Sequence, residues 1–271
     1  MNYPAMLATT AFGGAAFVSL VAVADSRTAE QSAAAAPTNA TTQARIEGGA
    51  PFIDRFDTLN SRIWAVSDGW RNGDWAVNDW RRSQVRADGK LHLTLDRNQT
   101  DLAEFSGAEL QGRQKYGHGY YEVKMRAAPA SGTVSGFFTY TGPHFGDPWD
   151  EIDIEILGAK PREVMLTYFR DSKKVSYIHQ LGFDATAQEH VYGFDWQPGY
   201  IRWYVDGQMV HEATGEGLPL PITKQKLMVS LWGSQKLASW VGPFDPAEMP
   251  TVMTVDCIAF SVDFASRQGC N

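Results

Sequence analysis

The sequence predicts an all-β fold in which two antiparallel sheets pack as a sandwich. Short runs that alternate apolar and polar residues, turn signals between them and a high aromatic content of 9 Trp, 10 Tyr and 14 Phe support this fold class. The 271 residues show no long amphipathic helix, heptad pattern or internal repeat. Two packed sheets are therefore the simplest architecture that buries these runs.

Three segments show the alternation most clearly. In residues 91–95, 121–126 and 201–205, apolar side chains occupy every second position, which places them on one face of a strand. Asp206-Gly207 follows the third segment and supplies the left-handed residues of a tight hairpin. We expect half-buried antiparallel strands at all three places.

Residues 1–24 predict a signal peptide. They are apolar and rich in Ala and Val, and they end in Ala22-Val23-Ala24, a small-x-small cleavage pattern. An uncleaved membrane anchor is the alternative, since no Lys or Arg precedes the apolar stretch and its length reaches that of a membrane span. Under both interpretations the folded domain is exported, and we expect a secreted or periplasmic protein.

Residues 25–49 predict a disordered linker, because they are rich in Ala, Thr, Ser and Gln and lack aromatic side chains. Residues 50–271 then form one folded domain with one sizeable core, and we expect it to be a monomer. Its two cysteines, Cys257 and Cys270, are either paired in a disulfide or buried as free thiols.

The formal charge of −7 argues against nucleic acid as a partner. The one basic cluster, Arg81-Arg82 with Arg86, is too short for a nucleic-acid surface. The chain also lacks His-Glu-x-x-His, Walker, Gly-x-Ser-x-Gly and Cys-x-x-Cys patterns. Their absence excludes the usual metalloprotease, nucleotide-binding and α/β-hydrolase interpretations.

A run of alternating acidic and apolar residues carries the strongest chemical signal. Within residues 149–158, Glu151, Asp153 and Glu155 fall on one face of a strand and isoleucines on the other. Like charges on one face repel, so a merely solvated face is the weaker interpretation. Glycoside hydrolysis needs an ionised nucleophile and a protonated acid on either side of the scissile bond, and Asp153 can hydrogen-bond to either glutamate.

Sugar rings need flat apolar partners together with polar groups for their hydroxyls. The chain offers several candidates of both kinds, whereas Trp196 and Trp203 lie within apolar alternation and are assigned to the core. The candidates are Trp70, Asn72, Phe137, Trp149, Trp232 and Trp240.

The run Trp-Asp-Glu-Ile-Asp-Ile-Glu-Ile-Leu-Gly at residues 149–158 resembles the active-site strand of glycoside hydrolase family 16, in the form without a bulge that lichenases carry. The likeness covers nearly all of residues 52–262. It implies a β-jelly roll with a concave substrate cleft and a retaining mechanism. In that mechanism Glu151 is the nucleophile, Asp153 its assistant and Glu155 the acid/base, and no cofactor is required for catalysis.

The resemblance also implies substrate contacts. The positions that match lichenase cleft residues are Asn72, Glu109, Trp149, Trp232 and Trp240. This chain departs from lichenases at Gln111, Thr167 and Phe169, where lichenases carry Arg, Asn and Tyr. Altered hydroxyl contacts are expected at these three positions.

The resemblance implies a retaining endo-β-1,3-1,4-glucanase. A depolymerase of a bacterial exopolysaccharide such as succinoglycan and a transglycosylase share the same chemistry and remain open, as does a non-catalytic glucan-binding jelly roll. The resemblance further suggests a structural calcium ion, held by the carboxylate of Asp256 and the backbone carbonyls of Arg55 and Gly89. A bare surface aspartate is the alternative at that position.

Overall fold

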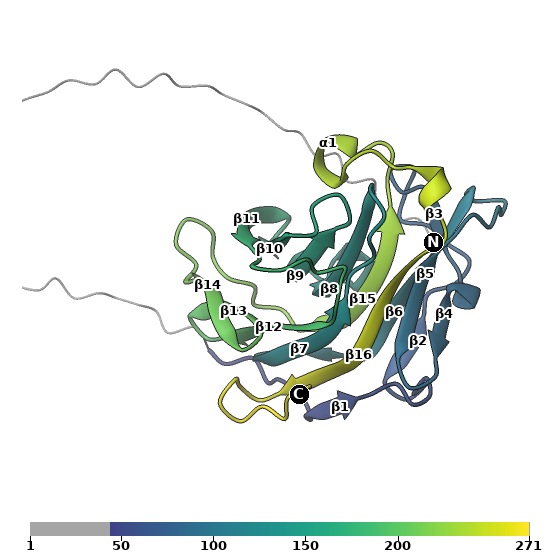
Figure 1. The fold of residues 1–271 in the computed structure, drawn as a ribbon. Coiled ribbons are helices and arrows are strands. Elements are labelled where there is room, and N and C mark those ends of the chain that lie inside the picture. The colour runs from purple at the N-terminus through teal and green to yellow at the C-terminus, as the bar shows by residue number, and fades with distance from the viewer. Residues whose placement is uncertain (1–43, 271) are drawn as a thin grey trace, which may run out of the picture. The chain divides into compact units, whose positions relative to one another are not determined.

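The computed structural model describes residues 44–270. The predicted signal peptide and most of the predicted linker lie outside these residues. Figure 1 shows two layers of strands, and the register confirms two eight-stranded sheets. The helical segments of the described chain are short: η1 (Arg82–Gln84), η2 (Pro143–Phe145), α1 (Ala238–Val241) and η3 (Pro246–Glu248). The predicted all-β sandwich is confirmed.

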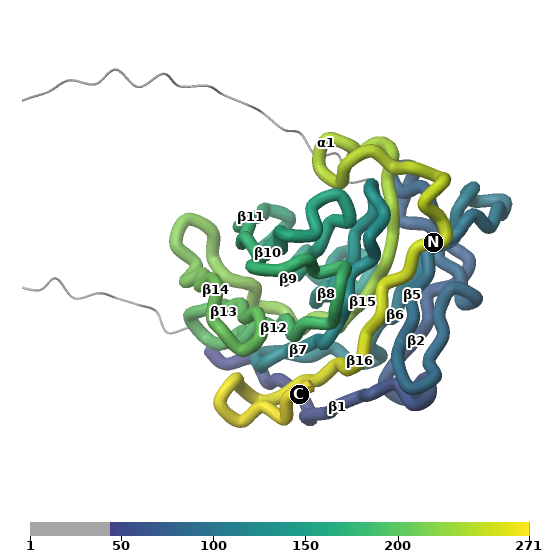
Figure 2. Tube along the Cα trace, in the orientation of Figure 1, coloured from purple at the N-terminus to yellow at the C-terminus, as the bar shows by residue number. Residues whose placement is uncertain are grey.

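The first sheet has the order β14-β13-β12-β7-β16-β5-β4, with β1 paired to β16. Its strands lie side by side along the chain path in Figure 2. Their bounds are β14 (Gln208–Ala213), β13 (Tyr200–Val205), β12 (His190–Gln197), β7 (Gly119–Arg126), β16 (Thr251–Ser261), β5 (Leu91–Leu95), β4 (Val85–Ala87) and β1 (Phe52–Asp54). The three strands expected from alternation are β5, β7 and β13.

The second sheet has the order β11-β10-β9-β8-β15-β6-β2, and β3 pairs with β6 in parallel. Its strands are β11 (Lys173–Gln180), β10 (Glu163–Arg170), β9 (Asp150–Leu157), β8 (Thr133–Thr141), β15 (Gln225–Gly233), β6 (Phe105–Tyr116), β2 (Trp64–Val66) and β3 (Asn78–Trp80). The acidic run forms β9 near the middle of this sheet, where strands pair on both sides of it.

Isoleucines of β9 anchor the second sheet to the core. Ile152, Ile154 and Ile156 are at most 1% exposed and belong to the large buried cluster between the sheets. Trp196 and Trp203 lie in the same cluster, as the sequence predicts. The alternation of β9 therefore points Glu151, Asp153 and Glu155 away from the core.

The folded domain begins before Gly49, earlier than the predicted end of the linker. The amides of Gly117 and His118 donate to the carbonyls of Gly48 and Ile46, at 2.9 and 3.0 Å. The Ile46 amide in turn donates to Nδ1 of His118 at 2.8 Å. These backbone groups are satisfied by pairing with the fold, so the prediction of disorder is wrong for this end of the linker.

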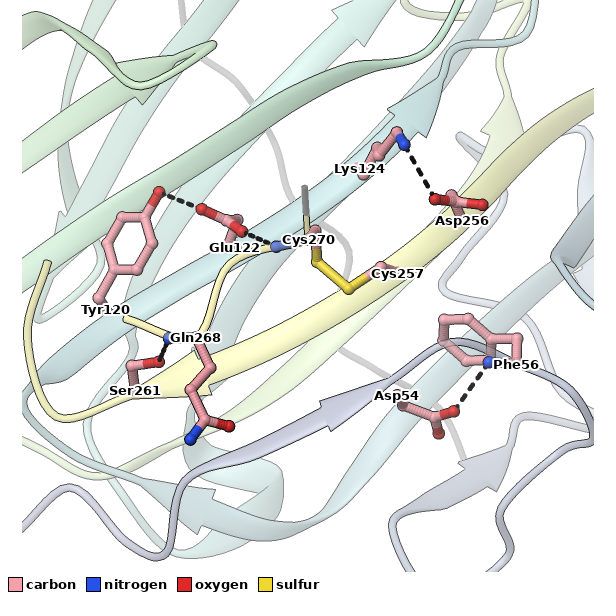
Figure 3. Close-up of a disulfide and its surroundings, with 10 residues drawn as sticks. All are labelled: Asp54, Phe56, Tyr120, Glu122, Lys124, Asp256, Cys257, Ser261, Gln268 and Cys270. Atoms are coloured by element: carbon pink, nitrogen blue, oxygen red, sulfur yellow. Dashed lines mark hydrogen bonds and ion pairs between the residues drawn. A yellow bond between two sulfur atoms is a disulfide. The ribbon is translucent and has the colours of Figure 1, made fainter. Parts of the chain in front are cut away.

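Cys257 and Cys270 form a disulfide, which answers the question that their sequence left open (Figure 3). Both cysteines are fully buried. The amide of Cys270 donates to the buried carboxylate of Glu122, to which the hydroxyl of Tyr120 also donates at 2.8 Å. The disulfide and these hydrogen bonds hold the C-terminal segment on β7 and β16.

Candidate active site

Three carboxyl groups share one face of β9. Glu151, Asp153 and Glu155 alternate with the core isoleucines, and Asp153 is only 4% exposed. We call the face of the second sheet that carries these carboxyls the catalytic face. Asp150 points the other way and is buried, where Arg170 pairs with it at 3.0 Å and the amides of residues 222 and 223 donate to it.

Glu151 receives hydrogen bonds from two neighbours. The indole Nε1–H of Trp149 donates to Oε2 of Glu151 at 2.6 Å. Asp153 also hydrogen-bonds to Glu151, and this bond raises the pKa of Asp153 while lowering that of Glu151. The proton of this bond therefore resides on Asp153, and the negative charge is most stable on Glu151.

Burial opposes charge at all three carboxyls. Burial raises the pKa of Glu155 to about 7. Burial, followed by the charges of both glutamates, raises the pKa of Asp153 well above its ordinary value. Burial and the charge of Glu155 also raise the pKa of Glu151 to about 8, against the hydrogen bond from Trp149. Near neutral pH the group retains protons, which supplies an acid next to a carboxylate.

Neighbouring strands place aromatic and small residues beside the carboxyls. Tyr140 of β8 and Phe169 of β10 lie directly opposite Glu151 in the register. Burial and the charge of Glu151 raise the pKa of Tyr140 to about 12, so its hydroxyl stays protonated. Gly136 lies opposite Glu155 and has no side chain to fill the space beside that carboxyl.

Tryptophans gather at the end of the catalytic face next to Glu155. Trp232 of β15 is 9% exposed, and its ring meets those of Trp75 and Trp240 at centroid distances of 4.9 and 5.9 Å. Trp80 belongs to the same apolar cluster, and its Nε1–H donates to Asn72 Oδ1 at 3.0 Å. Trp70 packs against this cluster too. The structure therefore brings together the sequence-predicted residues Trp70, Asn72, Trp232 and Trp240.

Glu109 anchors a polar group on β6. Its carboxyl is 4% exposed and accepts hydrogen bonds from Ser67 at 2.7 Å and from the Gln111 amide at 2.8 Å. Burial raises the pKa of Glu109. The Gln111 amide also reaches the Ser67 hydroxyl at 3.2 Å, so its donors serve protein groups.

Thr167 and Phe169 both reach the catalytic face from β10. Thr167 lies opposite Asp153, and its hydroxyl donates to Ser176 at 3.0 Å. Phe169 stacks on Trp149 with 5.0 Å between centroids and 10° between planes. Both residues are close to fully buried, so they form part of the floor of the catalytic face and do not project from it.

The assignment of Phe137 to the sugar site is wrong. Its side chain is 0% exposed, lies in the core cluster and meets Phe194 at 6.1 Å. Phe138 takes the catalytic face instead, because it lies opposite Asp153 while Phe137 lies opposite Ile154. Sequence reasoning also missed Tyr140, which counting every second residue from Phe138 would have found.

The surroundings of Asp256 do not fit a calcium ion. The Asp256 carboxylate contacts the ammonium groups of Lys124 at 3.1 Å and Lys90 at 3.5 Å, and Figure 3 shows the first of these pairs. These cations lower the pKa of Asp256 although burial opposes the shift. No group of three or more His, Cys, Asp or Glu side chains suited to a metal occurs within residues 44–270. Two ammonium groups on the only expected carboxylate ligand oppose a divalent cation.

Three buried carboxyls on one strand of a β-sandwich, with Asp153 hydrogen-bonded to Glu151, can supply the acid and the carboxylate that glycoside hydrolysis requires. The chain belongs to the glycosyl hydrolases family 16, whose family model matches residues 72–256. Among the described residues, no helix is long and apolar enough to cross a membrane. Catalysis by hydrolases of this family requires no cofactor.

Several bacterial glucan-hydrolysing proteins align with most of this chain. It is 41% identical over 197 residues to a β-glucanase of Acetivibrio thermocellus, covering 72% of this chain and 58% of that protein. It is 39% identical over 212 residues to the endo-1,3-1,4-β-glycanase ExoK of Rhizobium meliloti, covering 78% of each. The structure of the Bacillus licheniformis β-glucanase matches with a TM-score of 0.74 and 38% identity, over 79% of this chain and 98% of that one. The chain thus spans less than two thirds of the Acetivibrio protein.

Proposed function

We propose that this protein is an endo-β-glucanase that hydrolyses β-1,3-1,4-linked glucan with retention of configuration. The observation that carries the proposal is the different environment of two glutamates on one strand. Hydrogen bonds with Trp149 and Asp153 favour the charged form of Glu151, although burial raises its pKa to about 8, whereas burial is the cause that raises the pKa of Glu155 to about 7. The names of the Acetivibrio and Rhizobium relatives support the substrate class.

The reaction takes two displacements. The Glu151 carboxylate attacks the anomeric carbon, and the bond from that carbon to the glycosidic oxygen breaks as Glu155 protonates the oxygen. Water then attacks the same carbon and gives its proton to the Glu155 carboxylate, and the bond to Glu151 breaks. Asp153 donates its hydrogen bond to Glu151, which orients the nucleophile. The tryptophan cluster next to Glu155 offers flat apolar faces for glucosyl rings.

A depolymerase of a substituted bacterial exopolysaccharide such as succinoglycan is the second candidate. The residues at which the chain departs from lichenases favour it, because Gln111 and Thr167 bond to protein acceptors and Phe169 carries no polar group for a plain glucan. We further propose that the protein acts as a secreted or periplasmic monomer. At Asp256 we infer that Lys90 and Lys124 neutralise the carboxylate in place of calcium.

The decisive test is the release of reducing ends from barley β-glucan, laminarin, carboxymethylcellulose and succinoglycan by the purified protein. We expect activity on barley β-glucan or succinoglycan and an initial product of unchanged anomeric configuration by proton NMR. An inverted product would contradict the role of Glu151 as nucleophile. A complete lack of reducing ends on every substrate would favour a non-catalytic glucan-binding protein.

A further inference from the structure

Lysines occupy both ends of the strand row that contains Glu151. The register across the second sheet runs from Lys226 on β15 through Tyr140 on β8 to Glu151, and from there through Phe169 on β10 to Lys174 on β11. Residues directly opposite one another in a sheet share a face. Each lysine is therefore two strands, or about 10 Å, from the nucleophile on the catalytic face.

Within residues 44–270 neither lysine forms an ion pair at 4 Å or less, although the charge of Lys174 lowers the pKa values of the three catalytic-face carboxyls on β9 and that of Lys226 lowers the pKa of Glu109. Lys174 is exposed, and its ammonium lies 5.8 Å from the centre of the Phe169 ring. Lys226 is partly buried, and its ammonium lies 5.0 Å from the centre of the Phe145 ring. Lys115 approaches the same ring at 5.3 Å, but it is neutralised by Asp147 at 2.5 Å. An ammonium held over an aromatic ring without a directly contacting carboxylate can bind a further anion.

The charges around Lys226 also favour binding of an anion. Lys115 lies opposite it on β6, and Arg113 is close enough to act on it. Burial, followed by these two cations, lowers the pKa of Lys226 against the opposing charge of Glu109. This local excess of positive charge occurs in a protein whose formal charge is −7, so it is not part of a general basic surface.

We propose that Lys226 and Lys174 bind carboxylate substituents of the glucan chain on both sides of the bond that is cleaved. The proposal rests on the proposed glucanase function and specifies its substrate class as an acidic β-glucan. A neutral glucan would lie across the same strands without forming an ion pair with either lysine. A carboxylate on the substrate would gain a direct ion pair with an ammonium that makes none within the described chain, which discriminates between acidic and neutral chains.

The test compares barley β-glucan with the same glucan after partial oxidation of its C6 hydroxymethyl groups to carboxylates. The measured quantity is the ratio of kcat/KM on oxidised glucan to kcat/KM on neutral glucan. Lys174→Gln and Lys226→Gln should each lower this ratio about two- to five-fold, the range expected for one partly exposed ion pair. The double variant should lower it about ten-fold if the two sites act independently.

The matched controls each remove one lysine charge on, or just before, the strand that carries the tested lysine. Lys173 neighbours Lys174 but lies opposite Arg170, on the other face of the sheet, and Lys224 precedes β15 and pairs with Glu47 at 3.8 Å. The Lys173→Gln Lys224→Gln variant should keep the wild-type ratio. High salt should reduce the wild-type ratio toward that of the Lys174→Gln Lys226→Gln variant, because the interaction is electrostatic.

Equal ratios in the two double variants would overturn the proposal. A binding measurement separates this outcome from failure of the proposed function. Calorimetric titration of both glucans into full-length protein with Glu151→Ala requires no hydrolysis. Tighter binding of oxidised glucan that disappears with Lys174→Gln and Lys226→Gln supports the proposal even if the wild type cleaves neither substrate. Equal binding of the two glucans overturns it.

Discussion

Trp149 donates its indole N–H to Oε2 of Glu151 at 2.6 Å while its ring stacks on Phe169. One side chain thus links the nucleophile to the aromatic surface beside it. A hydrogen bond to a carboxylate stabilises its charged form, which here counteracts the burial that raises the pKa of Glu151. The ring stack fixes the direction from which this hydrogen bond is donated.

Trp149→Phe should keep the stack and lose the hydrogen bond. Because a charge-assisted hydrogen bond contributes about 1.5–3 kcal/mol, kcat/KM should fall about ten-fold or more. The pKa of Glu151 should rise, so the acidic limb of the pH–rate profile should move to higher pH. Trp240→Phe is the control, since the buried Nε1 of Trp240 has no hydrogen-bond partner within the described chain. An equal shift of the acidic limb in both variants would contradict the role of Trp149.

Glu151→Ala should abolish hydrolysis, and added azide should restore turnover. Azide fits the space left by the carboxylate and attacks the anomeric carbon from the same side as Glu151 would, which yields a glycosyl azide of inverted configuration. Rates with and without azide, together with the anomeric configuration of the product, test this. Azide should not rescue Asp153→Ala in the same way. Near wild-type activity of Glu151→Ala without azide would exclude Glu151 as the nucleophile.

The catalytic strand was predictable because its chemistry and its period-two pattern coincide. Ile152, Ile154 and Ile156 had to be buried together, and this placed the carboxylates on the opposite face. The sequence could not show which of Phe137 and Phe138 faces the core, because two adjacent phenylalanines fit either register of the strand. Only the pairing of Phe138 with Asp153 decides which of the two reaches the catalytic face.

Other features depended on long-range pairing that local pattern does not encode. Lys226 and Lys174 lie on different strands, and only the register across β8, β9 and β10 places them in one row with Glu151. The polar composition around Ile46 likewise suggested disorder, yet its backbone pairs with His118 far along the chain. Composition indicates how much apolar area a segment can bury, but not which backbone groups it can hydrogen-bond to in the folded protein.

Glu155→Gln should stabilise the protein most at alkaline pH. The pKa of Glu155 rises from 4.5 to about 7 on folding, so the folded state favours the protonated acid. This group therefore supports folding least once the pH exceeds about 7, where its buried charge opposes the folded state. A neutral amide removes that cost. At pH 8 the melting temperature should therefore rise, by about 2–4 °C for each kcal/mol gained in the free energy of unfolding. At pH 4 wild type and variant should melt alike. A pH-independent difference would contradict the raised pKa.

Calcium should leave the melting temperature unchanged. Lys90 and Lys124 already neutralise Asp256, so millimolar calcium and a chelator should give the same unfolding curve. Asp256→Asn should destabilise the protein by no more than about 1 kcal/mol, as expected for partly exposed ion pairs. Thermal unfolding with both additives measures this. A calcium-dependent rise that Asp256→Asn abolishes would restore the expected metal site.

Gln111 and Thr167 should influence which glucan the protein prefers. The Gln111 amide donates to Glu109 and Ser67, and the Thr167 hydroxyl donates to Ser176, so these donors serve protein acceptors. Gln111→Arg adds further N–H donors next to Glu109, and Thr167→Asn extends a polar group from the row of Asp153.

Each hydrogen bond gained with a glucan hydroxyl should contribute about 0.5–1.5 kcal/mol, so the double variant should raise kcat/KM on barley β-glucan several-fold. The same bulk should lower kcat/KM on a substituted glucan such as succinoglycan, because the added groups occupy space that substituents need. Gln114→Arg is a control, since this residue lies on the exposed part of β6. If wild type already prefers barley β-glucan and the double variant is worse on it, the departures at these positions do not determine specificity.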